Sequence, residues 1–324
     1  MIVIHDLHEL HRPLKDVVLT IGNFDGVHLG HREIFRQILS RSRGCSGTSA
    51  VMTFVPHPLK LLAPEKLQPL INTYDEKERL IEASRIDVLF SLPFDAHFSK
   101  ISAEAFVRDI LVEKIGVRHL LVGYDYAFGR HREGDVEVLT TYSERYGFTL
   151  GVLDPVQEGE RLFSSTRVRE LILSGEVKEA VHWLGRHFSL EGTVVRGDGR
   201  GRGLGFPTAN LATAKELLPK QGVYAVKVRL GDVYFDGVAN LGKNPTFPGA
   251  SGGVEVHLLD FDKDIYGKPL RIYFMERLRG EKTFSGPDEL KNAILDDISV
   301  ARNILSTERL VIYREYLSEN PGSV

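Results

Sequence analysis

The sequence predicts an α/β domain built on a parallel sheet, followed by a small antiparallel β-barrel and a C-terminal helix. In the first half, apolar β-branched runs alternate with stretches of helical periodicity, which is typical of a doubly wound sheet with crossover helices. In the second half, short β-type runs broken by Gly, Pro, Asp or Asn follow one another without helices between them, which indicates an antiparallel barrel. The last long segment has the apolar stripe of an amphipathic helix.

The expected strands of the first half are short runs rich in Val, Ile, Leu and Phe. They cover residues 17–21, 50–55, 86–92, 117–122 and 148–153. The expected helices lie between and after these strands. They cover the segment around residues 34–39 and residues 75–84, 103–115, 135–146, 167–173 and 176–184. Ser102 is expected to cap the third of these helices, because its hydroxyl can accept a hydrogen bond from the first turn.

The expected strands of the second half are shorter and more polar. They cover residues 188–195, 222–230, 233–239, 253–259 and 269–275. A helix is expected from Pro287 to Leu305, because Pro287 suits a first helical turn and Asp288 and Glu289 complement the helix dipole there.

Composition bounds the class of protein. With 324 residues, 42% of them hydrophobic, the chain is expected to form two domains, because single cores rarely grow beyond roughly 250–300 residues. The change of pattern near Arg186 divides it into residues 1–185 and 186–324. The formal net charge of -3 argues against a general nucleic-acid-binding protein. The single cysteine, Cys45, excludes an internal disulfide, and no apolar run approaches the ~20 residues of a membrane-spanning helix. We therefore expect a soluble cytoplasmic protein.

A phosphate site is predicted where the first strand leads into the first long helix. The turn between them contains Gly22, Asn23 and Asp25, and free backbone N–H groups together with the helix dipole attract an anion at such a place. His28 and His31 project to the same side if the helix has begun by then. Two imidazoles beside a phosphate can donate hydrogen bonds to oxygens whose charge grows in a transition state. A bare pair of histidines at this spacing is more often a surface feature.

Three further segments of the first half carry polar groups. His57 lies between two prolines just past the strand 50–55, and Asp125 lies in the loop that the strand 117–122 enters. Ligands of open α/β sheets bind at the carboxyl ends of strands. The third segment is a run of hydroxyls at a helix start, followed by an arginine in the first turn; its members are Ser164, Ser165, Thr166 and Arg169. One hydroxyl is explained as a helix cap, whereas the whole set suits a triphosphate.

A glycine-rich stretch opens the second half. Five glycines fall among the nine residues 197–205, and arginines are interleaved with them. Such a stretch is expected to form neither a stable helix nor a strand. Composition alone leaves a flexible linker open, but the run enters the structured-looking segment 204–211 directly. Gly-rich backbone with interleaved arginine is typical of a phosphate-binding loop.

The motifs together resemble a known enzyme family. GNFDGVHLGH contains the HxGH signature of nucleotidylyltransferases and, with TFVPHP, GYDYAFG and SSTRVR, resembles a flavin adenylyltransferase domain. GRGLGFPTANL, GVANLGKNPTF and VEVHLLDFDKDIYG resemble a riboflavin kinase domain. In this order the motifs resemble, along essentially the whole chain, the bacterial bifunctional riboflavin kinases/FMN adenylyltransferases, or FAD synthetases. Tyr126 and Ala127 depart from the pattern, which has Phe and often Arg at these positions.

For the first domain, the resemblance implies a Rossmann-like nucleotidylyltransferase that transfers the adenylyl group of ATP to FMN and gives FAD and pyrophosphate. His28 and His31 would donate to the α-phosphate as catalytic groups. Phe54 and Phe128 are expected at the flavin ring. The residues expected at ATP or its phosphates in this domain are Gly22, Asn23, Asp25, His57, Asp125, Ser164, Ser165, Thr166 and Arg169.

For the barrel, the resemblance implies ATP-dependent phosphorylation of riboflavin to FMN. Glu255 would be the base that takes the hydroxyl proton, and His257, which shares its face by alternation, is a weaker candidate. Thr208 and Asn210 would offer oxygen ligands to Mg²⁺, although turn chemistry after Pro207 also explains them. The ATP-binding residues expected in this domain are Gly197, Arg200, Arg202 and Gly205.

Two alternatives stay open. The chain could be a single-activity adenylyltransferase whose barrel only binds flavin, or a flavin-binding sensor or carrier without catalysis. The Thr208, Asn210 and Glu255 set argues against the first, and the two histidines with the Ser-Ser-Thr run argue against the second. The expected partners are small molecules, namely riboflavin, FMN and ATP, with Mg²⁺ and without nucleic acid or membrane. A homo-oligomer is left open.

Overall fold

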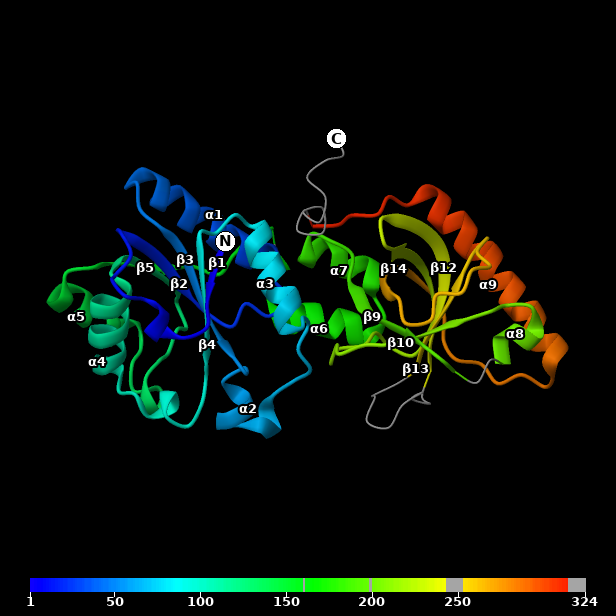
Figure 1. Cartoon of the computed structure of the whole chain (residues 1–324), viewed down its shortest axis with the longest axis horizontal. Coiled ribbons are helices and arrows are strands. Elements are labelled where there is room, and N and C mark those ends of the chain that lie inside the picture. The colour runs from blue at the N-terminus through cyan, green and yellow to red at the C-terminus, as the bar shows by residue number, and fades with distance from the viewer. Residues whose placement is uncertain (160, 198–199, 243–252, 314–324) are drawn as a thin grey trace. The chain divides into compact units, whose positions relative to one another are not determined.

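The computed structural model describes residues 1–159, 161–197, 200–242 and 253–313. The chain divides into two compact units, each drawn with its elements in Figure 1. Of the described residues, the first unit contains Met1–Gln68 and Tyr74–Ser164, and the second contains Pro69–Thr73 and Ser165–Tyr313. None of the helices in these ranges combines the length and apolar character needed to cross a bilayer.

The first unit is built on a six-stranded parallel sheet. Its strands are β1 (Ile2–Ile4), β2 (Val17–Ile21), β3 (Ser49–Val55), β4 (Val88–Pro93), β5 (Val117–Gly123) and β6 (Thr149–Leu153). Their order is β1-β4-β3-β2-β5-β6, and every neighbouring pair is parallel. The predicted parallel sheet is confirmed, and the sequence did not reveal the edge strand β1.

Helices connect these strands. They are α1 (Leu29–Gly44), α2 (Leu59–Leu62), α3 (Tyr74–Ala83), α4 (Ala103–Ala105), the π-helix η4 (Phe106–Ile115) and α5 (Val136–Tyr146). The described residues of this unit also contain 3₁₀ turns and a small hairpin: η1 (Leu7–Glu9), η2 (Pro64–Lys66), η3 (Phe98–Lys100), η5 (Arg130–Arg132), β7 (Gln157–Glu158) and β8 (Arg161–Leu162). His28, Ser102 and Asp135 each cap a helix with a side chain that accepts a backbone N–H, which satisfies a donor left over at the helix start.

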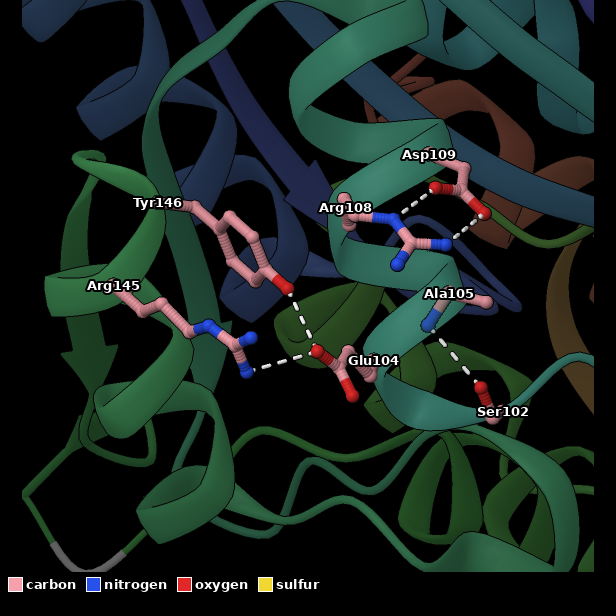
Figure 2. Close-up of polar contacts among 7 residues, drawn as sticks. All are labelled: Ser102, Glu104, Ala105, Arg108, Asp109, Arg145 and Tyr146. Carbon is pink, nitrogen blue, oxygen red and sulfur yellow. Dashed lines mark hydrogen bonds and ion pairs between the residues drawn. The ribbon is translucent and has the colours of Figure 1, made fainter.

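The structure is helical over the whole predicted segment 103–115, but most of this segment is not an α-helix. Only its first turn is α-helical, and the remainder is a π-helix, a form that is rare beyond a single turn. Figure 2 shows how α5 is held against it: the Glu104 carboxylate accepts hydrogen bonds of 2.9 Å from both Arg145 and Tyr146. The capping bond from the Ala105 N–H to the Ser102 hydroxyl is drawn in the same view.

The strand order places a switch point in the middle of the sheet. β2 lies between β3 and β5, and the chain passes from β2 towards β4 before it returns to β5 on the other side. All residues of β2 are buried. Because the strands are parallel, the loops that follow β2, β3 and β5 leave the same edge, which is where ligands of such sheets bind.

The second unit is built on a closed antiparallel barrel. Its strands are β9 (Ser189–Val195), β10 (Ala209–Ala212), β11 (Gly222–Leu230), β12 (Val233–Gly242), β13 (Gly253–Leu258) and β14 (Pro269–Arg279). They close in the order β10-β13-β12-β11-β14-β9. The predicted barrel is confirmed, and the strand that sequence reasoning missed is β10, which joins β9 to β13.

Helices accompany the barrel in the described part of this unit. They are α6 (Ser165–Ser174), α7 (Val177–Leu184), α8 (Arg200–Leu204) and α9 (Pro287–Thr307). α9 confirms the predicted C-terminal helix and buries Ala301 and Leu305 against Ala225 and Met275 of the barrel.

The glycine-rich stretch differs from expectation. Residues 200–204 form the short helix α8, so the prediction that this stretch contains no helix is wrong there. A hydrogen bond of 2.9 Å from the Phe206 N–H to the Gly201 carbonyl closes the turn, and Gly205 takes the left-handed conformation (φ 90°) just after the helix. Gly201 approaches the Phe206 carbonyl so closely that a Cβ there would overlap it. The glycines thus permit a tight turn of helix.

Candidate active sites

The turn after β2 is held in an unusual conformation. Phe24 and Val27 have positive φ values of 48° and 39°, and Gly26 has a φ of 86°. Such values cost side-chain-bearing residues free energy and persist only where surrounding contacts enforce them. Val27 is fully buried, and the Asp25 side chain is largely buried as well. The strained turn therefore presents a fixed backbone at the start of α1.

His28 and His31 meet at this helix start. His28 is the N-cap of α1, and its Nδ1 accepts a 3.4 Å hydrogen bond from the His31 N–H. Their rings stack with centroids 3.6 Å apart and planes inclined by 20°. The expectation that they face the same side is confirmed, although His28 caps the helix rather than belonging to it. Because Nδ1 accepts, a neutral His28 carries its proton on Nε2, where it can donate.

His57 and Asp125 follow the two strands beside β2. His57 comes two residues after β3, where its backbone N–H donates to the Tyr74 hydroxyl (2.9 Å) and its Nδ1 accepts from the Leu59 N–H (3.1 Å). Asp125 comes two residues after β5 and is exposed. Gly22, Asn23 and Asp25 therefore share one sheet edge with His57 and Asp125, as the motif positions predicted.

The two phenylalanines expected at the flavin lie in a chain of aromatic rings. Phe54 is half-buried and contacts the rings of Phe94 and Phe98. Phe128 is 7% exposed and packs in the core of the unit. Tyr126, at a position where the sequence departs from its family, stacks on Phe128 at 5.5 Å, and burial raises the pKa of its hydroxyl. A role of Phe54 and Phe128 in flavin binding stays a prediction.

The hydroxyl run straddles the boundary between the two units. Ser164 ends the first unit, and Ser165 begins α6 in the second. Thr166 is exposed in the first turn. The Arg169 guanidinium is buried and donates from Nε to the Pro69 carbonyl (2.9 Å), so it binds the short segment Pro69–Thr73 that belongs to the second unit. Its contact with a triphosphate stays a prediction.

In the barrel, three predicted residues gather around one strand pair. Asn210 on β10 is paired directly with Glu255 on β13, and Val195 of β9 flanks Asn210 on its other side. Asn210 is buried, whereas Glu255 is half-buried. Gly197 lies over Asn210 so closely that a Cβ would overlap its carboxamide. The absence of a side chain at Gly197 leaves room for the amide next to the Glu255 carboxylate.

Thr208 lines a cavity beside strands β9, β10 and β13 of the barrel. The cavity has a volume of about 290 Å³, with Val194, Ala209 and Val256 on the barrel side. The segment that contributes Phe261, Asp262, Lys263, Asp264, Ile265 and Tyr266 covers the other side. Apolar walls with a few convergent polar groups are typical of small-molecule sites.

His257 holds the chain leading into Thr208. Its Nδ1 lies 2.8 Å from the Pro207 carbonyl, which can only accept, so this nitrogen carries the proton. Its ring also meets Phe206 edge-on at 5.9 Å. Gly205 lies just after α8, in the loop that leads to these residues. The side chains of Arg200 and Arg202, both predicted to bind ATP, lie outside the described residues.

The mixture of donors in the barrel fits Mg²⁺. The Thr208 hydroxyl and the Asn210 carboxamide are neutral oxygen donors, and the Glu255 carboxylate is adjacent to Asn210 by register. Mg²⁺ prefers such oxygen ligands and keeps several waters. Within the described residues no group of three or more His, Cys, Asp or Glu side chains is placed to hold a metal ion.

Comparison with known proteins matches both halves. A family model described as FAD synthetase matches residues 11–167, and one described as riboflavin kinase matches residues 184–305. Relatives named bifunctional riboflavin kinase/FMN adenylyltransferase include one from Escherichia coli (strain K12), which is 38% identical over 93% of this chain and 97% of its own length. Another, from Haemophilus influenzae, is 35% identical over 93% of this chain and 98% of its own length.

A solved structure shares the whole architecture. A crystal structure described as a macrolide-efflux protein from Streptococcus pneumoniae superposes with a TM-score of 0.83 at 33% identity, over 93% of this chain and 98% of that one. The order of the two matched regions, the parallel sheet followed by the barrel, and the similarity along nearly the whole length all agree. The chain belongs to the family of bifunctional riboflavin kinases/FMN adenylyltransferases.

Proposed function

We propose that the barrel phosphorylates riboflavin to FMN at the expense of ATP, and that the sheet domain then transfers the adenylyl group of a second ATP to FMN. The family's two activities map onto the two matched regions in this order. The observation that carries the assignment is the presence of two separate polar centres: the stacked histidines at the switch point of the sheet and the Asn210–Glu255 pair on the barrel.

For adenylyl transfer, His28 and His31 act as donors to the α-phosphate. The phosphate of FMN attacks the α-phosphorus of ATP, and pyrophosphate leaves. Charge develops on the oxygens of that phosphorus, and fixed donors lower the barrier because they need no reorganisation when the charge appears. The backbone of Gly22 and Asn23, with His57 and Asp125 from the neighbouring loops, surrounds the phosphates. Ser164, Ser165, Thr166 and Arg169 supply further donors to the triphosphate.

For riboflavin phosphorylation, Glu255 takes the proton of the attacking 5′-hydroxyl. Asn210 and Thr208 would hold Mg²⁺, and the ion would supply positive charge to the transferred phosphoryl group. Gly197 and Gly205 allow the glycine-rich loop to approach the nucleotide with Arg200 and Arg202, and the 290 Å³ cavity beside Thr208 receives part of a substrate. His257 donates a hydrogen bond to the Pro207 carbonyl and thereby fixes the backbone next to Thr208.

We place the functional boundary between residues 185 and 186. The FAD synthetase match ends at residue 167, and the riboflavin kinase match begins at residue 184. A boundary at 185 keeps the Ser-Ser-Thr motif within the adenylyl domain. The substrates are small molecules, with no nucleic acid among them.

The single free cysteine suits the reducing cytoplasm in which we place the enzyme. Size-exclusion chromatography distinguishes a monomer from a homo-oligomer.

The proposal is tested by separating the two half-reactions. Glu255→Gln removes the base and is expected to abolish FMN formation from riboflavin while FMN supplied from outside still becomes FAD. Glu276→Gln, on β14, removes a carboxylate whose partner is Lys178 and is the matched control, expected to retain both activities. Retention of FMN formation by Glu255→Gln would exclude Glu255 as the base, and loss of both activities with the fold intact would refute the division between domains.

A further inference from the structure

A lysine is buried beneath the turn that precedes His28. Lys77, on α3, is 6% exposed. Its ammonium donates hydrogen bonds to the Asn23 carbonyl (3.2 Å) and to the Thr53 hydroxyl (2.9 Å). Burial lowers its pKa to about 8, an effect that the negative charges of Asp25 and Glu78 partly offset. Lys77 is therefore still mostly protonated at neutral pH, and its charge lies under the phosphate-binding turn.

The backbone of the turn above Lys77 is strained. Phe24 and Val27 both have positive φ values, a conformation that costs free energy for residues with a side chain. The strain lies directly between Asn23, whose carbonyl Lys77 binds, and His28. The Thr53 hydroxyl also donates to the Asn23 carbonyl, at 3.3 Å. Lys77 and Thr53 thus form a small network that fixes the turn to β3.

The same turn determines where the two histidines lie. The Phe24 ring contacts the His31 ring edge-on at 5.2 Å and the Phe35 ring at 5.1 Å. His28 follows Val27 directly and stacks on His31. A shift at Asn23 is therefore transmitted to the imidazoles through Phe24 and through the backbone.

The N-terminal turn of α3 also reaches the other phosphate loop. The Tyr74 hydroxyl accepts a hydrogen bond from the His57 N–H, and the Lys77 ammonium lies 5.4 Å from the centre of the Tyr74 ring. One helical turn thus contacts both the loop after β2 and the loop after β3. No motif singled out Lys77, because its sequence neighbours Asp75, Glu76 and Glu78 make it look like one charge of an exposed helix.

We propose that Lys77 is a positioning residue for adenylyl transfer, which holds the strained turn Asn23–Val27 so that His28 and His31 point at the reacting phosphate. The fold itself has little need of a cation here, because Thr53 alone can satisfy the Asn23 carbonyl and because a buried ammonium is costly. A methionine of similar length would fill the space. The position of Lys77 is thus better explained by the reaction than by stability.

The test compares Lys77→Met with Lys77→Arg and with a matched control. Lys114 lies in the same unit, and its ammonium donates to the Leu10 carbonyl (2.8 Å) away from the phosphate loops, so Lys114→Met removes a comparable interaction. Steady-state conversion of FMN to FAD is measured with varied ATP and FMN, and riboflavin phosphorylation by the same protein reports that the second domain is intact.

The proposal predicts a specific kinetic pattern. Lys77→Met lowers kcat for FAD formation by about 100-fold, the effect of a small misplacement of catalytic groups, with KM for ATP nearly unchanged. Lys77→Arg recovers part of kcat, and Lys114→Met retains the wild-type value. Riboflavin phosphorylation stays at the wild-type rate in all three proteins.

Other patterns would overturn it. A wild-type kcat in Lys77→Met would show that the turn keeps its shape without the ammonium. Equal losses in Lys77→Met and Lys114→Met, or a loss of both activities together with a lower unfolding temperature, would indicate a purely structural role. If Lys77→Met does not fold, Thr53→Val removes the hydroxyl of the same network while keeping its shape, and the proposal then requires a lower kcat for FAD formation in that variant.

Discussion

The imidazole rings of His28 and His31 are stacked, with centroids 3.6 Å apart and an interplanar angle of 20°. The arrangement follows from helix capping, because the His28 Nδ1 accepts the free N–H of His31 at the start of α1. Capping thus directs the His28 Nδ1 toward the backbone of α1, and it leaves Nε2 as the nitrogen that carries the proton and can donate. A local requirement of the helix start therefore orients the imidazole that we propose as a catalytic donor.

The histidines should act only on the second reaction. His31→Ala is expected to lower the rate of FMN-to-FAD conversion by about 10²–10³-fold, the usual effect of losing one donor to a developing charge. His28→Asn should do the same without unfolding the helix, because Asn caps helices well. Riboflavin phosphorylation by each variant is the internal reference. A parallel fall of both rates, with an unchanged circular dichroism spectrum, would contradict the division of roles.

The closeness of Gly197 to Asn210 gives a test of the proposed magnesium site. Gly197→Ala places a Cβ on the Asn210 carboxamide and should lower riboflavin phosphorylation by about 10–100-fold, as for other changes to the support of a metal ligand. The Mg²⁺ concentration needed for half-maximal rate should rise. Gly203→Ala is the matched control, because a Cβ there meets no atom within 4 Å. Equal behaviour of the two variants would argue against Asn210 as a ligand.

A partly buried ion pair joins α9 to strand β14 of the barrel. Arg279 on β14 donates from Nε (2.9 Å) and from a terminal nitrogen (2.8 Å) to the largely buried carboxylate of Asp297. Arg279→Met leaves this carboxylate without its partner and should lower the free energy of unfolding by about 3 kcal/mol. Arg302→Met breaks the exposed pair with Asp260 and should cost much less stability, because solvent screens exposed ion pairs. Chemical denaturation measures the free energy of unfolding of both variants. Equal losses of stability in the two variants would contradict this prediction.

Lys77 also predicts a pH dependence of stability. Its pKa is about 8 in the folded protein against 10.5 for the ordinary side chain, so between these values the unfolded state binds more protons. Stability due to this group therefore rises with pH from about 8 to 10.5, by about 3 kcal/mol in total. The free energy of unfolding of the wild type, measured relative to Lys77→Met, should increase over this range. A constant difference would show that the ammonium is not buried in solution.

The sequence was sufficient for the architecture because hydrophobic periodicity reports on burial along each element. Prediction from the sequence failed where the pattern of side chains did not reveal how the backbone is hydrogen-bonded. Thr208, Ala209 and Asn210 follow a proline and read as a turn, yet β10 begins at Ala209 because the barrel needs a strand between β9 and β13. The helix α8 was missed because five glycines suggest a loop, and only the bond between Phe206 and Gly201 reveals the turn.

The candidate sites show the same limit. The loops after β2, β3 and β5 could be grouped from the sequence, since parallel strands deliver them to one edge. Lys77 could not, because its role arises from contacts across 54 residues of chain to Asn23. Nor could the sequence show that Arg169 binds the Pro69 carbonyl, 100 residues away. Lys77 reads as a surface charge and Arg169 as a phosphate-binding residue until tertiary packing shows the backbone carbonyl to which each one donates.

The central claim, two reactions in one chain, is tested most directly by a time course. Purified protein is incubated with riboflavin, ATP and Mg²⁺, and the flavins are separated by chromatography. The account predicts that FMN appears first and is then replaced by FAD. Accumulation of FMN alone would contradict adenylyl transfer by the sheet domain. Unchanged riboflavin, with FMN still converted to FAD when supplied, would contradict the kinase assignment of the barrel.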